Sequence, residues 1–106
     1  MCIYPHQQDR QCAYSVSTLV LGLEEMYHAT HKPTYRDLAL ECAAWLRGKN
    51  PSGQVVYDPQ TGRCCDGVSG SVASSNCGAE SAIEAGFIEL ARRRLTRGRA
   101  GAIWQW

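Results

Sequence analysis

Two aspartates that could act together, Asp58 and Asp66, lie in a long connection over residues 49–76 that is rich in glycine and proline. Hydrolysis of a glycosidic bond ordinarily uses two carboxyl groups about 5 to 10 Å apart, and two side chains on one folded loop can meet that distance. The pair is therefore a candidate catalytic pair. Each aspartate also has a structural interpretation, because Asp58 precedes a proline and Asp66 a glycine, where aspartate often bonds its own turn.

Five further side chains extend this candidate site as substrate-binding residues: Tyr57, Asn50, Asn76, Glu80 and Arg63. Tyr57 offers a ring on which a sugar could stack, or it holds the loop down as an aromatic plug. Asn50 precedes a proline, so it either contacts ligand or shapes the loop. Asn76 is also a candidate N-cap for a following helix, and Glu80 would then suit the helix dipole in the first turn.

The elements that must position these residues are helical. Apolar residues recur at helical spacing and predict helices over about 16–31, 34–47 and 77–95. The connection between the first two is short, which makes them an antiparallel hairpin. The prediction is an all-α, single domain over 1–106, with a functional loop over 49–76 and an irregular basic and aromatic tail over 96–106.

Composition excludes several function classes. A chain of 106 residues with a formal net charge of +1 has no global attraction to nucleic acid or to an anionic membrane. It lacks any run near the roughly 18 apolar residues of a membrane span, and its start lacks the pattern of a signal peptide. A cytoplasmic protein is expected. Apolar stripes on the first two helices predict a covering partner, either a second copy or another chain.

The six cysteines carry no metal-binding spacing such as C-x2-C. With no export signal, free thiols are expected, and we expect neither a metal nor another cofactor. Phosphate-binding loops and dinucleotide-binding fingerprints are missing from the sequence as well.

Two sequence blocks carry a resemblance: YDPxTGxCxDG over residues 57–67 and NxGAES over residues 76–81. With the segment AWLRGKNPxG over 44–53, they resemble the C-terminal part of carbohydrate-active (α/α)6-toroid proteins, glycosidase-like domains found attached to or beside glycosyltransferases. The similarity covers about residues 9–91. It implies a helical-hairpin architecture, a pocket formed by loops at one end of a ring, and a saccharide or related polyol as ligand.

Such a ring contains many more helices than this chain supplies. We therefore expect a truncated toroid-like protein that binds a saccharide, with glycoside hydrolysis only if other chains complete the site. One alternative is a non-catalytic, oligomeric assembly module. A further alternative is nucleic-acid binding through five arginines between residues 92 and 99 together with Trp104 and Trp106.

Overall fold

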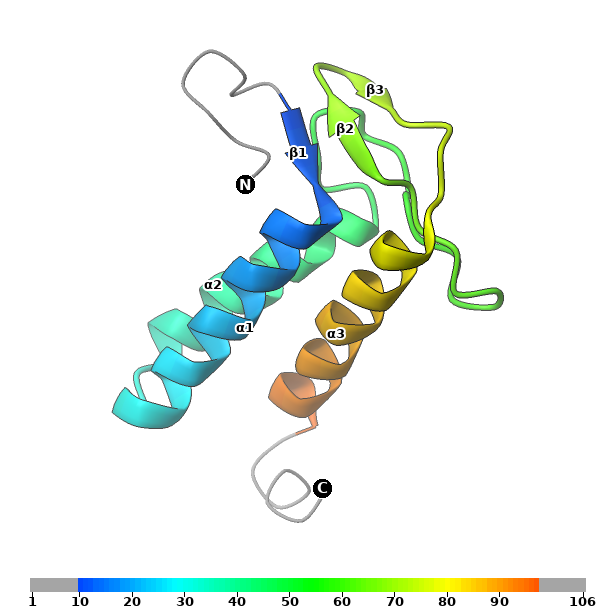
Figure 1. Ribbon diagram of the computed structural model, residues 1–106. Helices are drawn as coiled ribbons and strands as arrows, with labels where there is room; N and C mark the ends of the chain where they lie inside the picture. Colours follow the sequence, from blue (N-terminus) through cyan, green and yellow to red (C-terminus); the bar gives the residue numbers. More distant parts are fainter. Residues whose placement is uncertain (1–9, 98–106) are drawn as a thin grey trace.

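A computed structural model describes residues 10–97 (Figure 1). Helices α1, α2 and α3 lie side by side, and a small sheet gathers at one end of them. In chain order the elements are β1 (Arg10–Cys12), α1 (Ala13–Thr30), α2 (Pro33–Ala43), the 3-10 turn η2 (Ala44–Leu46), β2 (Gly67–Ser69), β3 (Val72–Ala73) and α3 (Ala79–Thr96). The predicted helix-rich character is confirmed. Within residues 10–97, no helix is both long and apolar enough to cross a bilayer.

The sheet corrects the all-α prediction. It has three antiparallel strands in the order β1-β2-β3, and Cys12 of β1 lies opposite Gly67 of β2. A Cβ atom at position 67 would lie 2.3 Å from the carbonyl oxygen of Gln11, so only glycine allows the strands to approach this closely. Strands of two or three residues are too short to show an alternating pattern, which is why the sequence did not indicate them.

The predicted hairpin of α1 and α2 is present, and its two helices run antiparallel (Figure 1). α1 ends where His31 adopts a left-handed conformation with φ of 58°. The backbone N–H of His31 donates to the carbonyl of Tyr27 at 2.7 Å, which satisfies one of the last carbonyls of the helix. Pro33 then begins α2, a position where its missing N–H costs nothing.

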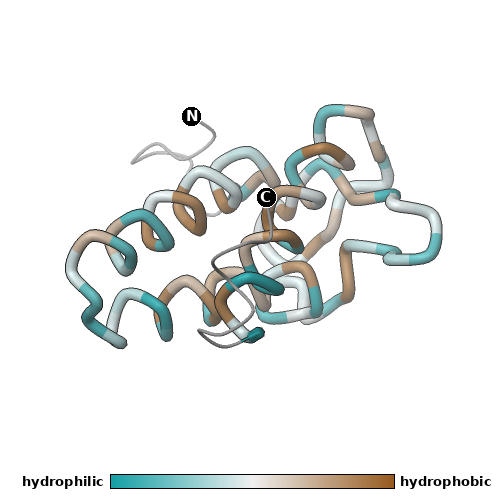
Figure 2. Tube along the Cα trace, turned by 90° about the horizontal axis from the view of Figure 1, so that it is seen from below, coloured by the Kyte–Doolittle hydropathy of each residue, from teal (hydrophilic) through white to brown (hydrophobic). Residues whose placement is uncertain are grey.

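The apolar core lies between the helices and below the sheet. Its largest fully buried members include Val20 of α1, Leu46 of η2, Val68 of β2 and Ile88 of α3. Figure 2 shows hydrophobic segments recurring along each helix, as expected when one face of each helix turns toward a shared core. Every layer of the fold therefore contributes to one core.

One ion pair lies at the edge of this core. The Glu24 side chain is 4% exposed and that of Arg94 17% exposed. The guanidinium of Arg94 donates two hydrogen bonds to the Glu24 carboxylate, at 2.7 and 2.6 Å. The two-point contact links α1 to the last turns of α3.

Candidate functional site

The connection between η2 and β2 is an ordered loop that packs on the helices. Short antiparallel bridges join Arg47 to Val55 and Tyr57 to Cys64. Val56, between them, is 3% exposed, and its N–H donates to the last carbonyl of η2 at 3.1 Å. Packing thus fixes the loop backbone, and the polar side chains project from a defined scaffold.

Asn50 braces the start of this loop. Its amide nitrogen donates to the carbonyls of Trp45, at 2.8 Å, and Gln54, at 2.9 Å. Its amide oxygen accepts the N–H of Ser52 at 2.9 Å. Both ends of the amide are engaged within the loop, which supports the loop-shaping interpretation over ligand contact.

Asp58 forms a turn at the exposed tip of the loop. Its carboxylate accepts the N–H of Gln60 at 2.9 Å and the hydroxyl of Thr61 at 3.0 Å. Its carbonyl accepts the N–H of Gly62 at 2.8 Å, where φ is 80° and glycine is favoured. The structural interpretation of Asp58 therefore accounts for its observed contacts.

Asp66 holds the start of helix α3 from outside that helix. Its Oδ1 atom accepts the N–H of Gly78 and the hydroxyl of Ser81, both at 2.8 Å. A Cβ atom at position 78 would lie 3.3 Å from Oδ1, so glycine gives the carboxylate room. The helix begins after Gly78, which corrects the prediction of Asn76 as its N-cap. Gly78 is the N-cap residue, and Asp66 holds its N–H from a distant part of the chain.

Hydrogen bonds lower the pKa of both loop aspartates. For Asp66 the N–H of Gly78 is the largest cause, followed by the hydroxyl of Ser81. For Asp58 the N–H of Gln60 is the largest cause. A general acid in glycoside cleavage needs a raised pKa so that it holds a proton near neutral pH. Each aspartate is suited to accept hydrogen bonds rather than to donate a proton.

Asp66 lies in an open cleft of about 570 Å³ where the sheet meets the start of α3. We call it the Asp66 cleft. It is lined by Cys12, Tyr14, Asp66, Gly78, Ala79, Glu80, Ser81 and Glu84. Glu80 lies in the first turn of α3, as the sequence predicted, and Glu84 one turn later. The cleft combines three carboxylates with the half-exposed ring of Tyr14.

Asp58 lies in a different cavity, of about 480 Å³, which we call the Tyr57 cavity. Its lining residues are Val55, Val56, Tyr57, Asp58, Pro59, Arg63, Cys65 and Cys77. The structure therefore brings Tyr57, Asp58 and Arg63 together, and separately Asp66 and Glu80. Asn76 lies between the two groups, where its carbonyl accepts the N–H of Asp66 at 2.8 Å.

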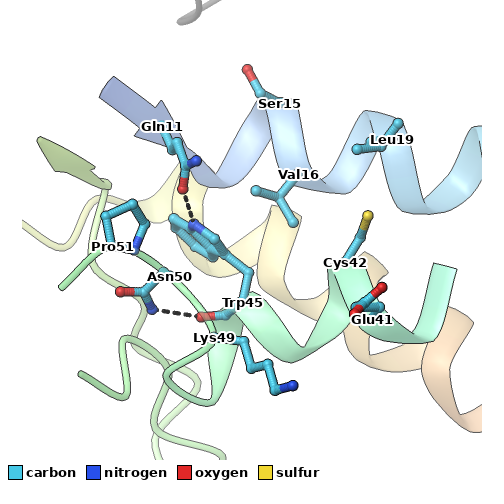
Figure 3. A pocket seen from close by; sticks show the side chains of 10 residues that line it. All are labelled: Gln11, Ser15, Val16, Leu19, Glu41, Cys42, Trp45, Lys49, Asn50 and Pro51. Carbon is cyan, nitrogen blue, oxygen red and sulfur yellow. Dashed lines mark hydrogen bonds between the residues drawn. The ribbon is translucent and has the colours of Figure 1, made fainter. Parts of the chain in front are cut away.

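A third, smaller pocket of about 220 Å³ lies between α1, α2 and the start of the loop (Figure 3). Val16, Leu19 and Pro51 give it a mainly apolar lining, with Asn50 at its loop side. The indole nitrogen of Trp45 donates to Oε1 of Gln11 at 2.8 Å, which closes its wall. Its polar lining residues are Gln11, Ser15, Glu41, Lys49 and Asn50, and its volume is less than half that of the Asp66 cleft.

Sequence reasoning missed Tyr14, Ser81 and Glu84 as members of the Asp66 cleft. A signal for Glu84 was available, because Glu80 and Glu84 are four residues apart on one helix and share a face. Tyr14 carried no comparable signal, because only the sheet brings the start of α1 to the start of α3. Ser81 adjoins Glu80 but is 8% exposed and serves mainly the cap.

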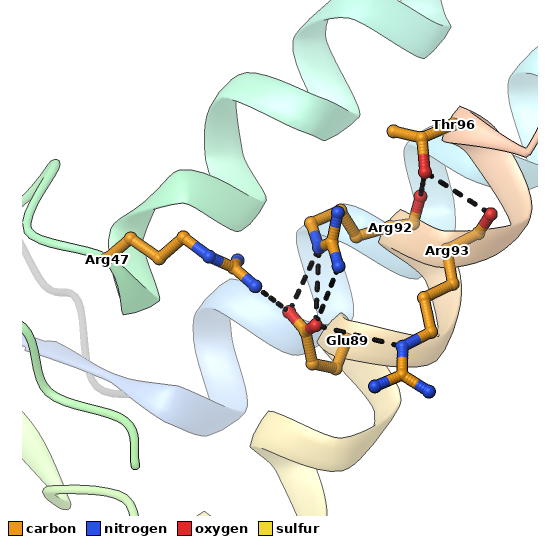
Figure 4. Close-up of polar contacts among 5 residues, drawn as sticks. All are labelled: Arg47, Glu89, Arg92, Arg93 and Thr96. Atoms are coloured by element: carbon orange, nitrogen blue, oxygen red, sulfur yellow. Dashed lines mark hydrogen bonds and ion pairs between the residues drawn. The ribbon is translucent and has the colours of Figure 1, made fainter. Parts of the chain in front are cut away.

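The arginine run on α3 is largely engaged within the chain (Figure 4). Glu89 pairs with Arg47 at 2.8 Å and with Arg92 at 2.9 Å, while Arg93 lies 4.0 Å away. Arg92 is the largest cause of the lowered pKa of Glu89. Arg94 binds Glu24, so Arg92 and Arg94 are both paired with carboxylates of this chain. The tail residues Arg99, Trp104 and Trp106 lie outside the described residues.

Cysteine chemistry differs in part from expectation. Cys42, Cys64, Cys65 and Cys77 are free thiols. Cys12 is disulfide-bonded, which corrects the expectation of free thiols at that position. Over residues 10–97, no group of three or more His, Cys, Asp or Glu side chains is arranged to hold a metal ion.

No family model matches this chain, and comparison with curated proteins finds no match. The resemblance to (α/α)6-toroid proteins thus depends on the quoted sequence blocks, and it stays a prediction.

Proposed function

We propose that the protein binds a saccharide or related polyol in the Asp66 cleft. The observation that carries this proposal is the Asp66 carboxylate, which is held in place through Oδ1 by Gly78 and Ser81. Oδ2 accepts no hydrogen bond from residues 10–97 and lies in a cleft lined by two further carboxylates. A fixed, ionised acceptor is the group that sugar hydroxyls bind most strongly.

The rest of the cleft complements that acceptor. Glu80 and Glu84 supply additional acceptors from one face of α3, and Tyr14, 48% exposed, supplies a ring edge or face for the apolar side of a sugar. A volume of about 570 Å³ is within the range of small-ligand sites. The negative charge of the lining favours a neutral polyol over a phosphorylated sugar.

Binding is favoured over hydrolysis in this chain. The lowered pKa values of Asp58 and Asp66 suit neither to the role of general acid, and the two line separate cavities. Glycoside cleavage would require a protonated carboxyl group, which neither Asp58 nor Asp66 supplies.

Titration of the isotope-labelled protein with neutral mono- and disaccharides, followed by NMR, tests the proposal. We expect shifts confined to amides around residues 66 and 78–84. Asp66→Asn retains an oxygen that can accept from Gly78 and Ser81 but loses the charge. We expect affinity to fall about tenfold or more, because a hydrogen bond to a charged group contributes about 1.5–3 kcal/mol.

Two variants control this experiment. Asp58→Asn changes the other loop aspartate and should leave affinity unchanged, whereas Glu84→Gln should weaken binding without touching the helix cap. Absence of shifts with every sugar, or equal losses for Asp58→Asn and Asp66→Asn, would contradict the proposal.

A second candidate function is self-association, which an exposed apolar stripe on α3 favours. Ile83, Phe87 and Leu90 are 58%, 44% and 51% exposed, and their spacing places them on one helix face. Gly86 beside them has no atom within 4 Å of where a Cβ would stand, so nothing around it in residues 10–97 requires glycine there. Glycine at a helix surface does permit close approach by another helix.

A second copy of the chain fits this stripe. Glu80 and Glu84 occupy the start of α3 and the arginines its end, so antiparallel pairing of two α3 helices sets acidic against basic ends. A parallel pairing would align like charges. Light scattering across a concentration series should show a dimer that Phe87→Glu converts to monomer. Val55→Glu, at a site 66% exposed on the loop, is the control that should remain dimeric. A monomer at all concentrations would remove this candidate.

A further inference from the structure

Beyond β2 and β3 the two segments stay hydrogen-bonded toward two cysteines, with Ser75 as an extra residue on one side. The N–H of Ser74 donates to the carbonyl of Gly67, and the N–H of Asp66 donates to the carbonyl of Asn76, each at 2.8 Å. The next residues outward on the two segments are Cys65 and Cys77. Residues opposite each other in antiparallel segments have Cα atoms about 4.5–5.5 Å apart, which is within the range that a disulfide spans.

The two side chains also share surroundings. Cys65 and Cys77 both line the Tyr57 cavity, and both are free thiols, Cys65 partly buried and Cys77 exposed. The Cys77 thiol donates to the carbonyl of Ser75 at 4.0 Å, and it is close enough to the Cys65 thiol to affect the pKa of that group. After burial, this neighbour is the next cause that raises the pKa of Cys65.

We infer that Cys65 and Cys77 are a reversible disulfide site, closed by exchange with a low-molecular-weight disulfide such as oxidised glutathione. This inference does not depend on the proposed function.

The exchange proceeds in two steps. The Cys77 thiolate, exposed to solvent, attacks one sulfur of oxidised glutathione, forms a mixed disulfide and releases one glutathione thiolate. The Cys65 thiolate then attacks the Cys77 sulfur, forms the internal disulfide and releases the second glutathione. Two protein thiols lose two electrons and two protons, and one glutathione disulfide is reduced to two thiols.

The neighbouring thiol is a poorer partner. Cys64 is 1% exposed, and burial raises its pKa to about 12, so its thiolate is scarce at neutral pH. Its thiol donates to the carbonyl of Cys65 at 3.3 Å, directed away from solvent. A bond between adjacent Cys64 and Cys65 would strain the intervening peptide.

The consequence for the fold is local. A Cys65–Cys77 bond closes a ring that contains the β2–β3 hairpin and both Asp66 and Asn76. It would hold the Asp66 segment against the start of α3 in addition to the existing cap. Because a cross-link restricts the unfolded chain, the thermal midpoint should rise on oxidation and return on reduction.

Peptide mapping after treatment with glutathione buffers of graded redox potential tests the site. A protease that cleaves before aspartate separates Cys65 from Cys77 at Asp66, so the internal disulfide appears as a linked peptide pair. We expect this pair, the loss of two titratable thiols and no lasting glutathione adduct. A persistent adduct on Cys77 without a linked pair would overturn the inference.

Single variants identify the partner. Cys65→Ser should abolish the linked pair and accumulate the Cys77 adduct, whereas Cys42→Ser should change nothing. Cys64→Ser should retain the linked peptide pair. If Cys64→Ser instead loses the pair and Cys65→Ser retains it, the bond joins Cys64 to Cys77. Mapping of the wild-type chain decides whether the bond forms at all, even if a variant folds poorly.

Discussion

The buried contact between Glu24 and Arg94 gives the sharpest stability prediction. Glu24→Gln keeps the shape of the side chain and removes its charge, so the Arg94 guanidinium exchanges two charge-assisted bonds, at 2.7 and 2.6 Å, for at most one bond to a neutral amide oxygen. Removing one member of a buried pair costs about 3–5 kcal/mol. Since Arg94 retains 17% exposure and water can partly replace the carboxylate, we expect about 3 kcal/mol.

Urea unfolding followed by circular dichroism measures this loss, with an unchanged slope as evidence that the unfolding reaction is the same. The exposed pair Arg36–Asp37, at 3.2 Å, is the control, and Asp37→Asn should change stability by less than about 0.5 kcal/mol. His28 lies 3.7 Å from Glu24 but is 53% exposed, so His28→Gln should also have a small effect.

A double variant separates the cost of an unpaired buried charge from the cost of burying both charges. Replacing both Glu24 and Arg94 by leucine removes two buried charges together, and such replacements are often neutral or stabilising. We therefore expect the double variant to be more stable than Glu24→Gln. Two results would refute the argument that the fold depends on this desolvated ion pair. One is a loss of unfolding free energy below about 1 kcal/mol for Glu24→Gln, and the other is a double variant less stable than Glu24→Gln.

Two further predictions concern glycine and pH. Gly67→Ala should lower the thermal midpoint strongly, since its Cβ would lie 2.3 Å from the Gln11 carbonyl oxygen. Gly22→Ala, where the structure leaves open space, should stabilise α1 by about 0.5–1 kcal/mol. Equal effects of the two variants on thermal unfolding would contradict this prediction. The lowered pKa of Asp66 contributes stability that is present above its unfolded-state pKa and is lost as pH falls through its folded-state pKa. Asp66→Asn should therefore show a shallower loss of unfolding free energy than wild type on acidification below about pH 4, and parallel profiles would contradict the capping role.

The sequence predicted the helices better than the site. Apolar spacing located the helices, and Pro33 marked the start of α2. It did not show which apolar residues are buried, since Leu19, Leu38 and Phe87 are exposed. The sheet was missed because a close approach at Gly67, rather than an alternating pattern, produces it. The turn interpretation of Asp58 agrees with its hydrogen bonds, since those involve residues two and three positions away.

Contacts between distant parts of the chain were harder to predict. The Asp66 cap on α3 and the Glu24–Arg94 pair join residues 12 to 15 and 70 positions apart, respectively. Propensity scales describe neighbours in sequence, so a carboxylate that caps a helix from another segment has no local signature. The same is true of Tyr14, which reaches the cleft only because the sheet forms.

The N–H of Gly78, the residue before α3, is hydrogen-bonded to Asp66, a residue of a different segment. The amide hydrogen of Gly78 is held by the carboxylate that also lines the cleft, so its exchange with solvent depends on how firmly Asp66 is positioned. A ligand on Oδ2 or a bond across the neighbouring cysteines would each slow that exchange. The exchange rate of the Gly78 amide therefore reports both ligand binding and disulfide formation, and its measurement needs no label on the ligand or on the thiols.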